Sequence, residues 1–235
     1  MSGLWVESCF SGLNNVPIGS ILKEAFGLPA AVENDVNACA LAEKKFGCCQ
    51  DVSDFIWLTV SNGCGGALFL NNALYRGVSG NAGELGHIVV EEDSRFTCGC
   101  GNHGCLEIEA AGPGIARHYK LIHPDSTLSA AEIAEMARNG DADAIKVFSD
   151  EGRYLGRAIA AAVNTVNPLK VVIGGGVSAS FDLFAETLRE TVNSRIYRFA
   201  NPNLVIETTR LGYDAPLIGT AVLALDGRFF TGETE

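Results

Sequence analysis

The chain has 235 residues, 47% of them hydrophobic and 19% charged, and its 17 basic and 28 acidic side chains give a formal net charge of −11. This length suits one large domain or two smaller ones, and the apolar runs are shorter than the roughly 18 residues that a membrane span requires. The acidic balance, with no basic cluster, argues against direct contact with nucleic acid, and the first residues lack a secretory pattern, so we expect a cytoplasmic protein.

The first quarter of the chain predicts two helices separated by a short strand. Apolar periodicity predicts a helix over 18–26, followed by a strand that ends at Glu33. Asn34 and Asp35 are residue types that cap helices, so a second helix is expected to begin there and to stop at Gly47. Asp35 would then lie at a strand-to-helix junction, where a rigid scaffold holds its side chain.

From residue 54 onward the pattern alternates strands and helices. Strands are predicted over 54–60, over 66–77 with a hairpin turn at Asn71 and Asn72, over 86–92, from Lys170 into a triple-glycine turn, and over 204–209. Helices are predicted over 106–119 with a break at Gly112–Pro113, and over 129–140, 141–167, 181–195 and 215–225. The apolar stripe of the long helix is predicted to be Ile145, Phe148, Leu155, Ile159, Ala162 and Val166. This alternation predicts the α/β class.

Three cysteines, Cys98, Cys100 and Cys105, lie within eight residues of the segment TCGCGNHGCLE. Zinc prefers thiolate and imidazole ligands in a tetrahedron, so this spacing predicts a zinc site. The fourth ligand is His87 or His103, and we favour His87 because a loop that folds back onto it is less crowded. The alternatives are a disulfide from Cys105 to Cys98 or Cys100, or three thiols without a ligand. Four protein ligands leave no open position, so the zinc would be structural.

Five motifs follow one another along the chain: VENDVNACALAE, NALYRGVSGNAGELGH, CGCGNHGCLE, VVIGGGVS and LGYDAPLIGTAVLA. Together they resemble the ROK family, which groups bacterial sugar kinases and sugar-responsive repressors. The resemblance extends over nearly the whole chain from GLNNVPI onward. It implies an actin-like, hexokinase-like (ribonuclease H-like) ATPase fold of two α/β lobes around a cleft, here with an incomplete small lobe and a complete large lobe.

The same resemblance implies a sugar site in the cleft. Carried over by motif position, the residues that hold the sugar are Asn34, Asp35, Glu84, His87 and Glu107. Asp35 would be the catalytic general base, since an attacking hydroxyl needs a carboxylate to accept its proton. His87 would direct one ring nitrogen to zinc and the other to a sugar hydroxyl. Taken singly, Glu84 and Glu107 are equally compatible with surface carboxylates, and Asp35 with a helix cap.

Two glycine-rich turns are candidates for nucleotide binding. Glycine has no Cβ, so the backbone amides of NGCGG could approach phosphate oxygens and GGG could accept adenosine against the backbone. The residues are Asn62, Gly63, Gly65, Gly66, Gly174, Gly175 and Gly176. Either turn is equally compatible with a tight turn that binds nothing. A kinase would require ATP and Mg²⁺ here.

Two departures from the family pattern bear on activity. Family kinases begin with a strand carrying Asp-x-Gly-Gly-Thr around the ATP phosphates, which this chain lacks, and Asn62 stands where they commonly have threonine. We therefore expect a carboxyl-terminal piece with a small-lobe remnant over 1–36, a large lobe with the zinc loop over 37–212, and a terminal helix that returns to the small lobe over 213–235. An open sheet edge beside LPAAVEN and a partly uncovered terminal helix predict a homodimer or higher oligomer.

Two functions are compatible with these features. The first is an ATP-dependent kinase for a hexose or N-acetylhexosamine, expected to be inactive as these 235 residues alone. The second is the sugar-sensing domain of a ROK repressor without its DNA-binding region. Asp35 favours kinase ancestry, whereas the absent phosphate loop and Asn62 favour sensing or an inactive fragment. Both functions require a small-molecule sugar, and the residues do not select which one.

Overall fold

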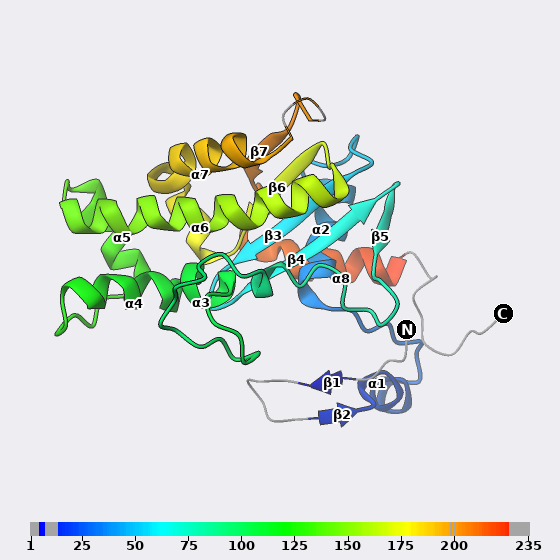
Figure 1. Ribbon diagram of the computed structural model, residues 1–235. Coiled ribbons are helices and arrows are strands. Elements are labelled where there is room, and N and C mark those ends of the chain that lie inside the picture. Colours follow the sequence, from blue (N-terminus) through cyan, green and yellow to red (C-terminus); the bar gives the residue numbers. More distant parts are fainter. Residues whose placement is uncertain (1–4, 8–13, 198, 200, 226–235) are drawn as a thin grey trace.

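A five-stranded mixed sheet organises the computed structural model, which describes residues 5–7, 14–197, 199 and 201–225 (Figure 1). The strand order is β5-β4-β3-β6-β7. The strands are β3 (Phe55–Val60), β4 (Cys64–Leu70), β5 (Ala73–Tyr75), β6 (Lys170–Gly174) and β7 (Val205–Thr208). The first three are antiparallel neighbours, and β6 and β7 run parallel to β3. The mixed sheet with helices on both faces confirms the predicted α/β class.

The central strand β3 is buried on both faces, as expected of a strand covered by helices on each side. Ile56, Leu58 and Val60 belong to a core with the helices of one face. These helices are α3 (Leu106–Ala110), α4 (Gly112–Ile122), α5 (Ala130–Arg138), α6 (Ala142–Val166) and α7 (Phe181–Arg195). Phe55 and Trp57 face the opposite core, which contains residues of α2 (Asp35–Phe46) and α8 (Ala215–Leu225). Figure 1 shows α6 and α7 on one side of the sheet and α2 and α8 on the other.

Local capping explains why α2, α5 and α6 begin where the sequence predicts. Asn34 caps α2, Ser129 forms a capping box with Glu132 at the start of α5, and Asp141 caps α6. The predicted hairpin turn is also confirmed, because Asn71 and Asn72 both have positive φ, at 53° and 58°.

The amino-terminal elements lie apart from the large sheet. β1 (Trp5–Glu7) and β2 (Asn14–Val16) form an antiparallel hairpin that the sequence did not predict, and α1 (Ile18–Phe26) follows as predicted (Figure 1). The predicted strand ending at Glu33 is wrong, since 28–34 has no regular structure. No described strand pairs with this segment, and Pro29 has no amide hydrogen to donate.

The prediction of a strand over 86–92 is also wrong. A 3₁₀ turn, η1 (Leu85–His87), begins this region, and beyond it only Val89 makes a single bridge, to Cys105. The amides of Val90 and Glu91 both donate to the carbonyl of Gly104, at 2.8 and 3.2 Å, so no ladder can continue. The apolar residues here belong to a loop rather than to a strand, with Val90 buried and Val89 exposed.

Two smaller outcomes concern α6 and the membrane. Ile145 is 48% exposed, so the predicted apolar stripe is wrong at that residue, and the neighbouring Ala144 faces the core instead. None of the helices within the described residues has the length and apolarity to span a bilayer. The division into 1–36, 37–212 and 213–235 and the homo-oligomer stay predictions.

Candidate functional site

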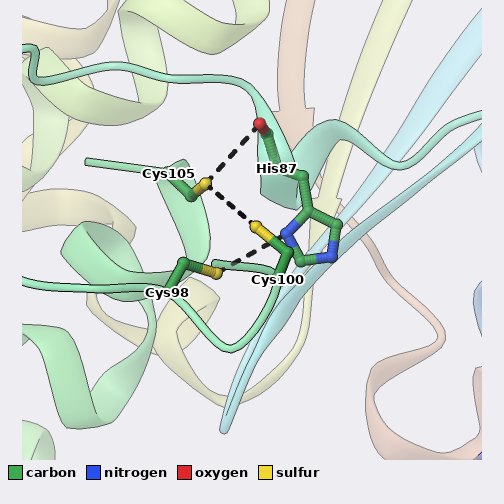
Figure 2. Close-up of side chains that lie close together, drawn as sticks. All are labelled: His87, Cys98, Cys100 and Cys105. Atoms are coloured by element: carbon green, nitrogen blue, oxygen red, sulfur yellow. Dashed lines mark hydrogen bonds between the residues drawn. The ribbon is translucent and has the colours of Figure 1, made fainter. Parts of the chain in front are cut away.

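One side chain from η1 and three from the following loop converge on a common point (Figure 2). The donor atoms of His87, Cys98, Cys100 and Cys105 all lie within 4.8 Å of one another. Cys98 Sγ is 3.6 Å from His87 Nδ1, and Cys100 Sγ is 3.6 Å from Cys105 Sγ. A tetrahedron with metal–sulfur bonds of about 2.3 Å has edges of about 3.8 Å, so the donor set fits a four-coordinate soft cation.

The loop takes this shape through its own backbone. Thr97 bridges His103, the amide of Cys98 donates to the carbonyl of Asn102 at 2.7 Å, and Gly101 turns the chain with φ of 93°. The bridge keeps His103 outside the cluster, whereas His87 lies in it. All cysteines within the described ranges are free thiols, so neither disulfide alternative is present.

The pKa values of the three thiols in the cluster are shifted in different directions. Burial raises the pKa of the Cys98 thiol and raises that of Cys105 to about 12, whereas a backbone hydrogen bond from Asn102 lowers the pKa of Cys100. Cys98 and Cys105 are therefore neutral at pH 7 before a cation binds. Coordination deprotonates a thiol, so metal binding here would release protons.

The second ring nitrogen of His87 faces away from the cysteines. His87 Nε2 is 4.0 Å from Glu84 Oε2, and the side chains of His87 and Glu84 are 38% and 58% exposed. Glu84 immediately precedes η1. The imidazole therefore connects the cysteine cluster on one side with a solvent-accessible carboxylate on the other.

Glu107, two residues after the last cysteine, reaches the turn between β3 and β4. Its Oε2 accepts a hydrogen bond from the amide of Cys64 at 3.1 Å. A Cβ on Gly63 would lie 2.6 Å from the same oxygen, so a side chain at this position would displace the carboxylate. The absence of a side chain at Gly63 therefore leaves room for the carboxylate of Glu107.

Asn34 and Asp35 begin α2 beside the same turn. Asn34 Oδ1 accepts from the amides of Val36 and Asn37 at 2.9 and 3.2 Å, and Asp35 Oδ1 accepts from the amide of Val36 at 3.0 Å. A Cβ on Gly65 would lie 3.0 Å from a methyl group of Val36, so the first turn of α2 rests on the start of β4. Asn34, Asp35 and Glu107 thus flank one short stretch, residues 63–65.

Sequence reasoning missed Glu33 and Arg76. Arg76 Nη2 is 2.7 Å from Glu33 Oε2, and the side chain of Glu33 is only 5% exposed. The signal was present, because the two residues stand inside the VENDVN and LYRG motifs. Their pairing depends on a contact across 43 residues of sequence.

A cavity of about 720 Å³ opens on the far side of the β3–β4 turn. Asn62 and Gly176, from the two predicted nucleotide turns, both line it, together with residues of α4, α5 and η2 (Gly176–Ser180) and the ring of Tyr213. Glu132 and Glu135 share its rim with Arg138, which pairs with Glu135 and Asp182 and lowers the pKa of Asp182.

The other predicted nucleotide glycines contact protein atoms. A Cβ on Gly65 would meet Val36, one on Gly66 would meet Leu85, one on Gly174 would meet Trp57, and one on Gly175 would meet the carbonyl of Val60. Gly175 also has a φ of 85°. These four glycines have packing or backbone reasons for their identity.

The comparison with protein-family models decides the family. The model described as "ROK family" matches residues 6–227. The chain belongs to the ROK family. Its relatives include a xylose repressor of Bacillus subtilis (strain 168), 30% identical over 216 residues, which cover 92% of this chain and 56% of the repressor. The chain thus spans about half the length of the curated relatives that it matches first.

Solved ROK structures have the same architecture. A ROK transcriptional regulator, a homolog of the E. coli MLC protein, matches with a TM-score of 0.87 at 30% identity, over 95% of this chain and 59% of that one. A ROK glucokinase from Streptomyces griseus, in complex with glucose and AMPPNP, matches with a TM-score of 0.81 at 32% identity, over 91% and 74%. This ROK chain therefore has the actin-like, hexokinase-like ATPase fold, and its relatives include both repressors and sugar kinases.

Proposed function

We propose that this chain binds a neutral sugar at Asn34, Asp35, Glu84, His87 and Glu107, and that the site is of the sugar-kinase type. The observation that carries the proposal is the convergence of polar groups on the β3–β4 turn. Glu107 bonds the amide of Cys64, and the first turn of α2 rests on Gly65. Sugar hydroxyls need both hydrogen-bond acceptors and donors. The carboxylates of the site supply acceptors, and the side-chain amide of Asn34 and the imidazole of His87 supply donors.

Asp35 is the proposed general base. It is exposed in the first turn of α2, where the helix dipole stabilises a negative charge. A carboxylate there would accept the proton of the sugar hydroxyl that attacks a phosphoryl group. The side-chain oxygen of Asn34 caps α2, so the group that it would offer to the sugar is the side-chain NH₂, a hydrogen-bond donor.

Zn²⁺ is the proposed occupant of the cysteine cluster. Three thiolates and one imidazole fill the tetrahedron, so the ion would stabilise the loop and leave no coordination position for substrate. His87 and Cys105 would anchor the loop on both sides of the site. That anchoring would fix His87 Nε2 beside Glu84 and keep Glu107 over the turn.

The cavity beside Asn62 and Gly176 is the proposed site of the nucleoside part of ATP. Its volume of about 720 Å³ lies within the usual range of ligand pockets, about 300–1,000 Å³. Arg138, the cation at its rim, is already paired with Glu135 and Asp182. The phosphates would therefore depend on Mg²⁺ and on the backbone near Asn62.

A second candidate function is sugar sensing without phosphoryl transfer. It is favoured by the higher TM-score of the transcriptional regulator, 0.87 against 0.81 for the glucokinase, and by Asn62 in place of the usual threonine. Both candidates require the same sugar site. They differ in whether the bound sugar is then phosphorylated.

Calorimetry and a coupled ATP assay, with a panel of hexoses, pentoses and N-acetylhexosamines, separate the two candidates. For a kinase we expect turnover that falls about 10²- to 10⁴-fold in Asp35→Asn. Asp51→Asn is the matched control, because Asp51 is exposed beyond the opposite end of α2. Turnover that depends on Asp35 would select the kinase, whereas sugar binding without turnover is the result expected both of a sensor and of a kinase chain that is inactive by itself. Absence of binding to every sugar would contradict both candidates.

A further inference from the structure

A nearly buried ion pair joins the segment before α2 to the end of β5. Arg76 Nε and Nη2 both donate to Glu33 Oε2, at 2.8 and 2.7 Å. The side chains of Glu33 and Arg76 are 5% and 23% exposed. A carboxylate shielded from water to this degree needs its partner, since an unpaired buried charge is costly.

The other oxygen of Glu33 accepts hydrogen bonds from groups at the start of α2. Glu33 Oε1 accepts from the amide of Asn34 at 3.0 Å and from Asn37 Nδ2 at 2.9 Å. Asn37 is itself buried, so its amide group is held in place. Glu33 therefore fixes the backbone directly before Asp35 and the helical turn directly after it.

The backbone of Arg76 is hydrogen-bonded to the loop that carries Glu84 and His87. Its carbonyl accepts from the amide of Ala82 at 3.0 Å, which closes the loop after β5. The loop then crosses β4 closely, because a Cβ on Gly83 would lie 2.4 Å from the carbonyl oxygen of Gly66. Glu84 is the next residue. The position of Arg76 thus sets the start of the path to Glu84 and His87.

We propose that Glu33 and Arg76 are a positioning pair that fixes Asn34 and Asp35 relative to Glu84 and His87. Neither side chain is required to touch the sugar. The pair acts through the amide of Asn34 on one side and the loop closure at Ala82 on the other. This inference rests on the proposed sugar site for its consequence in binding, but the coupling of the two segments is a property of the protein without ligand.

Hydrogen exchange of the amides of Asn34 and Ala82 measures the coupling directly, and calorimetry with the sugar panel measures its consequence. In Arg76→Met we expect the hydrogen-exchange rate to rise about tenfold or more at both amides. We expect sugar affinity to fall about tenfold, because a small displacement of binding groups weakens the contacts that they make. Glu207→Gln is the matched control. This substitution breaks the partly buried ion pair between Glu207 and Lys170. Lys170 also donates to the carbonyl of Cys48, just beyond the opposite end of α2.

A combined Glu33→Gln and Arg76→Met variant separates positioning from stability. It removes both charges, so the melting temperature should recover relative to Arg76→Met, whereas the sugar affinity should stay low. If Arg76→Met does not fold, Arg76→Lys keeps the charge but loses the paired donors, and should show the same changes to a smaller extent.

A positioning role for the pair is contradicted if the exchange rate rises at only one of the two amides or at neither. It is also contradicted if Glu207→Gln lowers sugar affinity as much as Arg76→Met does. Recovery of sugar affinity in the combined variant would also overturn it. If wild-type protein binds no sugar, the proposed function fails, and the exchange measurement still decides whether the pair couples the two segments.

Discussion

The cysteine loop and the cavity wall lie on either side of the β3–β4 turn, and they are built in different ways. Residues 88–105 of the loop contain no regular helix or strand, and their side-chain donors converge on one point. The cavity wall consists largely of α4, α5 and η2, whose shape follows from caps and core packing. Because no regular helix or strand of the loop fixes the four donor side chains, their arrangement should depend on a bound ion, whereas the cavity should persist without any ligand.

The largest expected effect is on the loop. Cys105 is fully buried, so Cys105→Ser should abolish zinc binding and lower the free energy of unfolding by about 4 kcal/mol or more, as loss of a structural metal does. Metal analysis and urea unfolding measure both. Cys49→Ser, at an equally buried thiol outside the cluster, is the control and should leave the zinc content unchanged. Equal zinc in wild type and Cys105→Ser would remove the distinction between the two regions.

A second, smaller effect should come from a carboxylate that holds the loop independently of metal. Glu109 is 1% exposed and accepts hydrogen bonds from Ser94 and from His118, the latter at 2.7 Å. Burial alone would raise its pKa, but these hydrogen bonds from His118 and Ser94 hold the pKa of Glu109 below its ordinary value. Glu109→Gln should therefore cost about 1–3 kcal/mol at pH 7.

The pH dependence of this cost has a definite sign. A depressed pKa in the folded protein contributes stability above the unfolded-state value of about 4.3, and the contribution is lost as pH falls through the folded-state value. The difference between wild type and Glu109→Gln, measured by urea unfolding, should shrink as pH falls below about 4.3. A difference that grows as pH falls through that range would contradict this assignment.

The smallest expected effect lies in the cavity. A Cβ on Gly176 would meet only Tyr213 and Ser61, so Gly176→Val should narrow the cavity and weaken binding of a nonhydrolysable ATP analogue about tenfold. Zinc content and sugar affinity should not change. In Gly174→Ala the added carbon would lie 2.3 Å from Trp57, so stability should fall instead, by about 1–3 kcal/mol. Equal nucleotide binding in wild type and Gly176→Val would place the nucleotide elsewhere.

Local signals predicted much of this fold. Ser129 and Asp141 each mark a helix start, and the Asn71–Asn72 turn satisfies a conformation that few other residues adopt. The strand predicted over 86–92 failed because a run of β-branched residues shows which residues favour a strand, not whether a partner strand is available. The segment's amides instead converge on Gly104.

The candidate site was predictable where ligands are close in sequence or occur in motifs. Cys98, Cys100 and Cys105 are close in sequence, and His87 could be chosen over His103 by crowding alone. Glu33 and Arg76 stand inside the motifs, but their pairing was not predictable, because it forms only when the fold brings together two segments 43 residues apart. The glycines were ambiguous because one motif contains both Gly176, which lines the cavity, and Gly174, which packs against Trp57.

Glu107 offers the most direct test that one sugar site forms at the β3–β4 turn. Glu107→Gln keeps the size of the side chain and an oxygen that can accept from the amide of Cys64. Calorimetric titration of wild type and this variant, with the sugar that wild type binds most tightly, should show affinity reduced about tenfold or more, with zinc content and melting temperature unchanged. Equal affinity in the two proteins would contradict the assembly of the sugar site around this turn.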